Sequence, residues 1–503
     1  MDRKNWSQVS YNEQPQFIIL SAIRGPIWQR AIGAYQLANT CRQNNISAQV
    51  IDFIDMFNIE ELHKTVSKFV SPNLIAIGFS STFYTGSAPG ALSKDPMVSE
   101  EMRGQIFLDE NLLSIFDYIK SYNPLVKIIA GGANSWQLPS SEKFDAVFHG
   151  YSELSVVEYL SELLGRRQSK AIYSTNADCC IVDGDKMPLD IQNLNHRWQS
   201  NDFIFSGETL PIEIGRGCIF RCKFCSYPLN GKKKNDYVRD MSLIKDEMVD
   251  NWTNFGTTNY FFTDDTFNDS LDKLRAMHMM IKSLPFQIKF WCFLRLELLY
   301  AFPEQIDILK DMGLSAASFG VETFHKGAGR AIGKSMDSEK QKSFLLDLYY
   351  NKWSEQVSIS CGMIVGLPGE SIEDLQNSFN WYSTEGKDLA VNWWPLSINP
   401  NGHYLSEFDK EYEKWGYTIS NLTDWVSPTM TKSIAFEIAK EYNLNGMYKE
   451  NSPTSTLLMS LLTLGFTFEE IRKWKAKDLP WSKILKKRLV MIKKYKQLLL
   501  GPE

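Results

Sequence analysis

Short apolar segments alternate with amphipathic segments through the first third of the chain. The apolar segments, each three to five residues long, lie at residues 16–20, 48–52, 74–78, 126–130 and 146–148. Helical spacing of apolar residues, every three or four positions, fills residues 27–44 and 153–164. Short apolar strands separated by amphipathic helices predict a parallel, doubly wound sheet. Such a sheet binds ligands at the carboxyl ends of its strands.

The loops after these predicted strands are rich in glycine and serine. Four of them are candidates for ligand contact, at residues 24–28, 80–83, 131–134 and 150–153. Small residues let the backbone approach a bulky ligand closely. The sequence therefore predicts a ligand site along this edge of the N-terminal sheet.

A second region of alternating strands and helices runs from residue 210 to about residue 400. Its predicted strands lie at residues 211–215, 259–265, 289–295, 316–322, 362–366 and 390–395, and a helix is expected at residues 242–253. Polar residues follow several of these strands directly. In a barrel of parallel strands, the chemistry lies at the carboxyl ends.

The last hundred residues have helical periodicity throughout. We expect helices at residues 405–415, 431–449, 454–464, 467–475 and 482–500. Residues 471–503 hold eleven Lys and Arg against Asp478 and Glu503. An amphipathic helix with a solvated lysine face explains this composition. Docking of an acidic partner is the alternative, and it stays open at this stage.

Composition bounds the class of protein. The chain has 503 residues, 44% hydrophobic and 22% charged, with a net charge of −5. These values are typical of a soluble protein of about three domains and indicate no general affinity for nucleic acid. The N-terminus lacks the apolar core of a signal peptide, and the longest uncharged stretch, residues 69–93, is broken by proline and glycine. We therefore expect a cytoplasmic protein that does not span a membrane.

Three cysteines on one loop are the main candidates for chemistry. Cys218, Cys222 and Cys225 have the spacing Cys-x3-Cys-x2-Cys directly after the predicted strand at residues 211–215. Three thiolates can hold three irons of a four-iron cluster and leave the fourth iron open for a ligand. Zinc sites are the alternative, but they favour four Cys or His ligands. The chain has no other Cys or His within twenty residues of the triad.

The remaining cysteines have no metal-ligand spacing. Cys41, Cys292 and Cys361 lie inside apolar segments, as small core residues do. Cys179 and Cys180 are adjacent and have no further ligands nearby. We expect all five to be structural.

The cysteine triad, with Phe224 before its last thiol, resembles the signature of the radical S-adenosylmethionine (SAM) enzymes. Later strands carry further similarities in the same order as in the family. Residues 316–323 resemble the strand whose acid faces SAM, residues 362–370 resemble the Gly-x-Ile-x-Gly strand, and residues 400–403 resemble the family's P-x-G-T turn. This resemblance covers roughly residues 15–405. It implies a partial (β/α)6 barrel and a [4Fe-4S] cluster that binds SAM.

The resemblance also implies which residues bind SAM. The strand-end acids Asp264 and Asp265 replace the family's Gly-Gly-Glu motif; by their chemistry alone, a paired-carboxylate acid/base role is the alternative. The other SAM contacts that we expect are Phe224, Arg295, Glu322, Gly362 and Gly366. Aromatic stacking on adenine, a guanidinium fork on a carboxylate and room beside glycine are the physical reasons.

The N-terminal third resembles the cobalamin-binding domain of many radical SAM enzymes. Residues 128–132 and the turn at residues 145–153 carry this similarity, with Tyr151 in place of the family's first acid. The resemblance implies cobalamin contacts at Trp28, Ser80, Ser81, Thr82, Phe83, Gly131, Gly132, Asn134 and Glu153. The Asp-x-His-x-x-Gly motif is absent, so we expect no protein histidine on cobalt. A Rossmann-like domain without a cofactor is the alternative, since fold alone does not fix function.

Together these similarities imply a cobalamin-dependent radical SAM enzyme that methylates an unactivated carbon. The alternatives are cyclisation or rearrangement without methyl transfer, and a non-catalytic cluster- or cobalamin-binding protein. A methylthiotransferase is disfavoured because residues 1–170 lack a second cysteine triad. The expected partners are a small-molecule or peptide substrate and a flavodoxin- or ferredoxin-type electron donor. The expected division is residues 1–170 for cobalamin, 171–205 as linker, 206–404 as barrel and 405–503 as helical domain.

Overall fold

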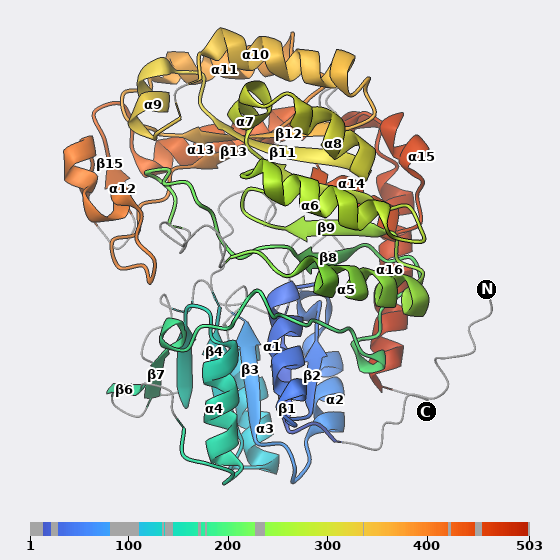
Figure 1. Ribbon diagram of the computed structural model, residues 1–503. Helices are drawn as coiled ribbons and strands as arrows, with labels where there is room; N and C mark the ends of the chain where they lie inside the picture. Colours follow the sequence, from blue (N-terminus) through green and yellow to red (C-terminus); the bar gives the residue numbers. More distant parts are fainter. Residues whose placement is uncertain are drawn as a thin grey trace.

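The computed structural model shows two α/β units stacked one above the other, with C-terminal helices packed against both (Figure 1). It describes residues 14–21, 29–80, 110–132, 135, 144–169, 173–176, 179–226, 237–334, 336–420, 424–447 and 455–500. The predicted fold class is confirmed: a doubly wound N-terminal sheet, a partial barrel of parallel strands and a helical C-terminal region.

The N-terminal sheet has seven strands in the order β2-β1-β3-β4-β5-β7-β6. All neighbouring pairs are parallel except β6 with β7. The strands are β1 (Phe17–Leu20), β2 (Ala48–Ile51), β3 (Ala76–Ser80), β4 (Lys127–Gly131), β5 (Ala146–His149), β6 (Tyr173–Asn176) and β7 (Cys179–Asp183). The five predicted strands are therefore present, each within two residues of its expected bounds.

Helices cover both faces of this sheet. They are α1 (Ile32–Gln43), α2 (Ile59–Phe69), α3 (Glu110–Tyr122) and α4 (Glu153–Leu163). Phe17 and Ile19 belong to the core shared with α1 and α4, whereas Ile18 and Leu20 belong to the core shared with α2 and α3. Alternate residues of a strand point to opposite faces, so a strand covered on both sides must be apolar throughout.

Two strands of the N-terminal sheet, at residues 173–176 and 179–183, lie within residues 171–205, which we predicted to be a linker. β7 pairs with β5 over four residues, from Ala146↔Cys180 to His149↔Asp183, and β6 extends the edge. Burial of Cys179 and Val182 explains the pairing, because these side chains join the two cores of the sheet. No alternation of apolar and polar residues marks β6 in the sequence, since Ser174, Thr175 and Asn176 are all polar.

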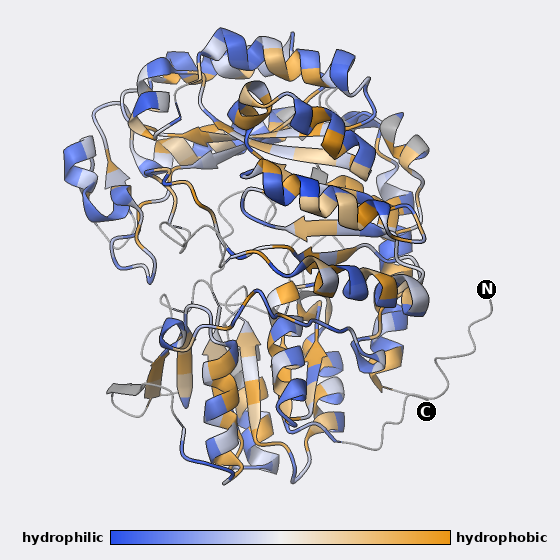
Figure 2. Ribbon diagram, in the orientation of Figure 1, coloured by the Kyte–Doolittle hydropathy of each residue, from blue (hydrophilic) through white to orange (hydrophobic). Residues whose placement is uncertain are grey.

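The second unit is a six-stranded parallel sheet in the order β13-β12-β11-β10-β9-β8. Its strands are β8 (Leu210–Glu213), β9 (Asn259–Thr263), β10 (Lys289–Leu294), β11 (Leu314–Glu322), β12 (Ser358–Val365) and β13 (Ala390–Pro395). Its helices are α5 (Met241–Phe255), α6 (Leu271–Lys282), α7 (Leu296–Ala301), α8 (Glu304–Met312), α9 (Lys326–Ala331), α10 (Ser338–Asp347) and α11 (Ile372–Ser383). Figure 2 shows these strands mostly apolar and the outward sides of their helices mostly polar.

The C-terminal helices pack on both units instead of forming a core of their own. They are α12 (Glu407–Lys410), α13 (Lys432–Met447), α14 (Ser455–Thr463), α15 (Phe468–Arg472) and α16 (Trp481–Leu500), with a hairpin of β14 (Thr418–Ile419) and β15 (Trp425–Val426). α13 packs against β13, and α14 contacts β9, β11 and β12. Leu458 and Leu461 of α14 share a buried cluster with Trp291 and Ala316 of the barrel strands.

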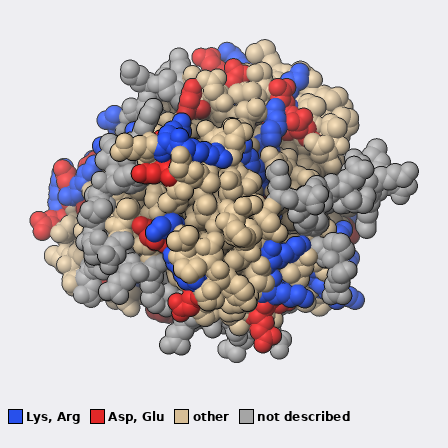
Figure 3. Space-filling view, turned by 90° about the horizontal axis from the view of Figure 1, so that it is seen from below, with Lys and Arg blue, Asp and Glu red and all other residues tan. Residues whose placement is uncertain are grey.

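The basic helix α16 joins the two units. Its Tyr495 is buried and accepts a hydrogen bond from the backbone N–H of Asp52, while Ile484 lies in the cluster beneath the barrel. Several of its lysines also serve packing: Lys487 donates to the carbonyl of Leu464, and Lys494 lies over the ring of Phe205. Seen from below, Lys and Arg side chains are interspersed with Asp and Glu (Figure 3). The amphipathic explanation of this helix therefore fits the structure.

A buried ion pair fastens the N-terminal unit to the barrel. Arg30 forms a fork to Glu208, with atoms 2.7 and 3.0 Å apart, and neither side chain is exposed. Its guanidinium also donates to the carbonyls of Asp202 and Phe203.

Among the described helices, none is long and apolar enough to cross a membrane.

Candidate functional site

The carboxyl ends of the two parallel sheets face one another. His149 at the end of β5 stacks on His403, which follows β13, with ring centroids 5.6 Å apart. The two sheet edges at which we predicted ligand binding therefore meet in the middle of the molecule (Figure 1).

The cysteine loop begins directly after β8 and is held between two later elements. Lys223 donates its backbone N–H to the carbonyl of Ile332, and its own carbonyl accepts from Phe408. Cys218, Cys222 and Cys225 form no disulfide and are partly exposed, unlike Cys41, Cys292 and Cys361, which are buried. The three predicted ligands are thus brought to one loop at the strand edge.

The donors around these sulfurs fit a cluster of thiolates. The hydroxyl of Thr266 lies 3.3 Å from the Sγ of Cys218, and Nη1 of Arg295 donates to the Sγ of Cys222 at 3.7 Å. The guanidinium of Arg295 also stacks on Phe220, 4.0 Å from its centroid. Hydrogen bonds and positive charge beside cysteine sulfur stabilise the thiolate, which is the form that holds iron.

The acids Asp264 and Asp265 after β9 have different surroundings. Asp264 is 4% exposed and its Oδ2 pairs with Lys273 at 3.0 Å, so its charge is already balanced inside the protein. Lys273 also pairs with Asp269 at 2.6 Å. Asp265 instead lies beside the cysteine loop, and burial, followed by the charges of Asp264 and Glu213, raises its pKa to about 7. Of the two acids, only Asp264 forms an ion pair among the described residues, so the predicted contact of Asp265 with SAM stays a prediction.

Arg295 lies at the cysteine loop, but its guanidinium already pairs with a carboxylate. It caps α7 and pairs with Glu297, to which its Nε donates at 2.9 Å. Lys334 is close by and pairs with Glu322 at 3.2 Å. Two cations and two carboxylates therefore lie next to Cys222, and the predicted contact of Arg295 with the SAM carboxylate stays a prediction.

Glu322 has a strained backbone at the end of β11. Its φ is +69°, a left-handed conformation that only glycine adopts readily, and the register shifts by one residue between Gly320 and Glu322. The next residue, Thr323, donates a 2.5 Å hydrogen bond to Oε1 of Glu370. Strain of this kind persists where the surrounding structure holds it, commonly at functional sites.

Two glycines that we predicted beside adenine have different roles. Gly362 lies in β12 between Gly320 and Asn392 of the neighbouring strands, and a Cβ there would meet nothing closer than 3.8 Å. Gly366 has a φ of +101°, and a Cβ there would lie 2.5 Å from the ring of Trp425. The structure therefore leaves room beside Gly362, whereas Gly366 makes room for the C-terminal hairpin.

Half-exposed aromatic rings line the inside of the barrel. Phe290, Cys292 and Leu294 of β10 point to the outer core, so Phe293 between them points inward, and its side chain is 41% exposed. By the same alternation Trp393 packs outward, while Trp394, 36% exposed, faces inward. Phe224 packs, partly buried, against the main core. The inside of the barrel thus presents apolar ring surface near the row formed by Gly320, Gly362 and Asn392 on neighbouring strands.

The N-terminal strand ends are described in part. Ser80, Gly131 and Gly132 lie at the ends of β3 and β4, where we predicted cobalamin contacts, and Gly132 has a φ of +103°. Trp28, Ser81, Thr82, Phe83 and Asn134 lie outside the described residues. Glu153 is not turned toward open space: its Oε1 pairs with Nη2 of Arg216 in the cysteine loop at 2.7 Å.

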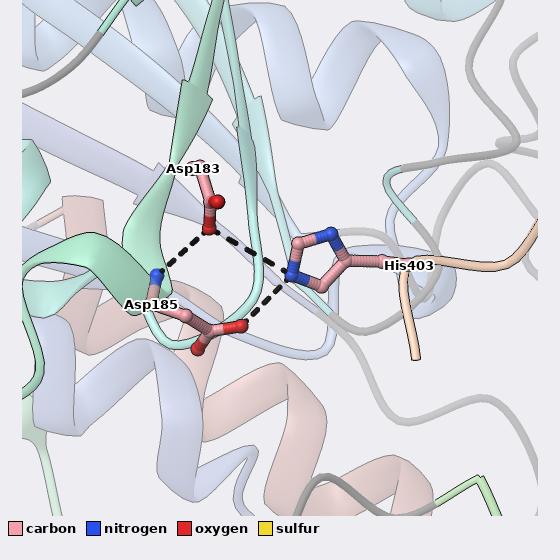
Figure 4. Close-up of side chains that lie close together, drawn as sticks. All are labelled: Asp183, Asp185 and His403. Atoms are coloured by element: carbon pink, nitrogen blue, oxygen red, sulfur yellow. Dashed lines mark hydrogen bonds and ion pairs between the residues drawn. The ribbon is translucent and has the colours of Figure 1, made fainter. Parts of the chain in front are cut away.

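A second polar contact closes the gap between the units (Figure 4). Nε2 of His403 lies 2.8 Å from Oδ2 of Asp185 and 4.0 Å from Oδ1 of Asp183, and the hydroxyl of Tyr404 donates to Asp185 at 2.8 Å. The hydrogen bond to Asp185 is the main cause of the raised pKa of His403. We call Asp183, Asp185, His403 and Tyr404 the strand-end latch.

Four functional candidates in the site escaped the sequence analysis: Glu213, Arg216, Lys334 and Glu370. Arg216 lies two residues before Cys218, and Glu370 ends the Gly-Leu-Pro-Gly-Glu segment that we read only for its glycines. Glu213 lies only three residues before its partner Arg216, but the partners of Lys334 and Glu370 are 12 and 47 residues away in sequence, so no local pattern marks those two.

A family profile and solved structures match this chain. Residues 212–382 match the Radical SAM superfamily. The search of curated proteins finds no match.

Two solved enzymes share the fold over nearly the whole chain. The radical SAM methyltransferase TsrM from Kitasatospora setae, with cobalamin and a [4Fe-4S] cluster bound, is 14% identical with a TM-score of 0.64, over 95% of this chain and 100% of TsrM. TsrM with tryptophan substrate and aza-SAM gives a TM-score of 0.60 at 14% identity, over 96% and 99%. The cobalamin-dependent radical enzyme OxsB is 13% identical with a TM-score of 0.60, over 97% and 80%.

Proposed function

We propose that this chain, which contains a radical SAM domain, is a cobalamin-dependent radical SAM enzyme that methylates an unactivated carbon. One observation carries the proposal: an open triad of partly exposed cysteines lies on the first strand end of a partial barrel, and that edge faces the ligand-binding edge of a doubly wound sheet. TsrM and OxsB bind cobalamin in the same two-unit fold.

Cys218, Cys222 and Cys225 would hold a [4Fe-4S] cluster. The cluster would supply one electron to split SAM into methionine and a 5′-deoxyadenosyl radical, and cobalamin would carry the methyl group. No protein nucleophile is needed, so the protein's own work is binding, orientation and exclusion of water. The Arg295 donor and the Thr266 hydroxyl keep two of the sulfurs oriented.

The charges around the cysteine loop fit SAM, which carries an ammonium, a sulfonium and a carboxylate. On the side of β8 and β9, Asp265 forms no ion pair within the described part of the chain, and burial, followed by the charges of Asp264 and Glu213, raises its pKa to about 7. A bound ammonium group would supply the missing positive charge and lower that pKa again. On the side of β10 and β11, Arg295 and Lys334 lie beside Cys222 and suit a carboxylate.

The inward-facing rings and glycines fit a flat ligand. Gly320, Gly362 and Asn392 form one row across β11, β12 and β13, and Phe293 and Trp394 expose ring surface next to it. Adenine would lie along Gly362, where an added Cβ would meet nothing closer than 3.8 Å, as the Gly-x-Ile-x-Gly resemblance implies. Substrate would enter between the two sheet edges. We infer a small-molecule or peptide substrate and an external electron donor.

For cobalamin, the chain offers the small residues Ser80, Gly131 and Gly132 at the strand ends. The one histidine at this edge within the described residues is His149, whose Nδ1 lies 2.8 Å from the hydroxyl of Ser135 and whose ring stacks on His403. These contacts favour a cobalt without a protein imidazole. A Co(II) paramagnetic resonance spectrum with imidazole nitrogen splitting would contradict this part of the proposal.

The test uses chain purified anaerobically with cobalamin, reduced with dithionite and given SAM with a deuterated methyl group. We expect brown iron–sulfur absorbance, bound cobalamin and transfer of the labelled methyl group to cobalamin or to a substrate that gains one methylene. Cyclisation or rearrangement would leave the product mass without that gain. An unreacted SAM pool would instead favour a non-catalytic binding protein.

A further inference from the structure

The cysteine loop and the opposite sheet edge are joined by one arginine. Arg216 lies on the cysteine loop, separated from Cys218 by Gly217 alone. Its Nε and Nη2 donate to Glu213 at 2.8 and 3.0 Å, and the same Nη2 pairs with Glu153 of the N-terminal unit at 2.7 Å. The guanidinium also lies over the ring of Tyr151, 4.3 Å from its centroid. One side chain therefore contacts both units.

This junction is buried and geometrically fixed. The side chains of Arg216, Glu153 and Glu213 are 8, 10 and 15% exposed. The backbone N–H of Arg216 donates to the carbonyl of Tyr237 at 2.8 Å, and Gly215 and Gly217 on either side allow the close turn that this requires. A buried charge pair with forked geometry fixes orientation more than it adds stability.

Glu153 and Tyr151 belong to the loop that follows β5, at the ligand edge of the N-terminal sheet. The backbone N–H of Tyr151 donates to Asp185 of the strand-end latch at 3.1 Å, so the contacts of Arg216 are connected to the latch. Movement of the cysteine loop would therefore move this edge with it, and the reverse also holds.

We propose that Arg216 is a positioning residue that sets the distance between the two cofactors, by holding the cluster loop against the cobalamin edge through Glu153 and Tyr151. The inference rests on the proposed function, because it needs both cofactors. Arg216 does not touch either reacting centre in this account; it acts through the two loops that it joins. A misplacement of about 1 Å in such an arrangement can cost about 100-fold in rate.

The test measures the magnetic interaction between reduced cluster and Co(II) cobalamin by paramagnetic resonance. Arg216→Lys keeps the charge but loses the fork and the stacked plane, and Glu153→Gln keeps the shape but loses one charge. The matched control is Arg42→Lys, because Arg42 forms a fork to Asp202 at 2.8 and 3.0 Å, is also 8% exposed, and lies away from the cysteine loop.

We expect the relaxation enhancement of the cluster signal by Co(II) to fall about twofold or more in Arg216→Lys and Glu153→Gln, because a looser site by about 1 Å weakens a steeply distance-dependent coupling. Iron and cobalt contents stay at the wild-type level, and Arg42→Lys keeps the wild-type coupling. Unchanged coupling in both test variants, or an equal fall in Arg42→Lys, overturns the role of Arg216 but leaves the proposed function untouched. Wild-type protein that holds no cobalt or no cluster overturns the proposed function as well.

Discussion

Glu370 is a buried carboxylic acid directly behind the strained end of β11. Burial is the main reason that the pKa of Glu370 is raised to about 8. The Oε2 atom of Glu370 has no hydrogen-bond partner among the described residues. The folded protein thus keeps a proton that the unfolded chain loses, so stability is full below the ordinary glutamate pKa and falls as the pH rises to about 8. In Glu370→Gln this loss should vanish. Urea unfolding of both proteins at pH 5 and pH 8 checks it.

From pH 5 to pH 8, the free energy of unfolding of Glu370→Gln should rise relative to that of the wild type by on the order of 3 kcal/mol. At pH 5 the two proteins should have nearly equal stability, since both carry a neutral group. An equal difference at both pH values would mean that Glu370 is ionised in the folded state.

Replacing a cysteine of the triad and replacing a cysteine of the core should have different effects on the iron content of the protein. Cys218→Ala is expected to lose the iron–sulfur absorbance with little change in unfolding of the metal-free protein, because the thiol is only half-buried. Cys361→Ala removes a fully buried sulfur and should cost about 1–2 kcal/mol while iron binding persists. Iron analysis and denaturation of both variants check this pairing. Full iron content in Cys218→Ala would remove this residue from the ligand set.

At the scale of single residues, the sequence indicates which residues are candidates for the chemistry, but not which residues they pair with. The triad could be found because its ligands are close in sequence. The sequence could not distinguish the roles of Asp264 and Asp265. They differ because the amine of Lys273 forms an ion pair with Asp264 but not with Asp265. Gly366 was predicted as a SAM contact, but its close approach to Trp425 could not be predicted, because Trp425 belongs to a hairpin with no clear sequence pattern.

Among the elements, the turn after β12 gives a direct test of how the C-terminal hairpin packs. Gly366→Ala adds a Cβ 2.5 Å from Trp425 at a φ of +101°, so strain and a clash add together. Gly369→Ala is the matched control, since its φ is +77° but no atom lies within 4 Å of the added Cβ. We expect a loss of about 1–2 kcal/mol for the control and clearly more for Gly366→Ala, measured by urea unfolding. Equal losses would show that the hairpin yields without cost.

Strands and helices with strong apolar patterns were predicted within a few residues, whereas short polar strands were missed. β6 is mostly polar, and β14 and β15 are only two residues long, so their pairing depends on neighbours that sequence does not show. The C-terminal helices were predicted as helices, but their packing on the barrel and on the N-terminal sheet depends on complementary surfaces that a helical period does not reveal.

For the molecule as a whole, the strand-end latch should depend on pH. Asp185, with a smaller effect of Asp183, raises the pKa of His403, while the neighbouring ring of His149 has a lowered pKa because of burial. The stabilisation is therefore complete below the ordinary histidine pKa and is lost as the pH rises through the raised value. Hydrogen exchange near residues 183–185 and 403–404, corrected for intrinsic rates, should show more opening at pH 8 than at pH 6.

The effect should stay below about 1 kcal/mol, because the pair is partly exposed to solvent. Asp185→Asn should remove the pH dependence and open the contact at both values. If exchange in the wild type is the same at pH 6 and pH 8, the latch is held by Tyr404 and packing instead of by the charge on His403.

The whole account depends on an open cluster that splits SAM between two facing sheet edges. The most direct measurement is the amount of 5′-deoxyadenosine formed from SAM by the anaerobically reduced, cobalamin-loaded chain, compared with a variant in which Cys218, Cys222 and Cys225 are all alanine. The account predicts product from the wild type and none from the triple variant. Equal product from both, or none from a wild type that holds its full iron, would contradict it.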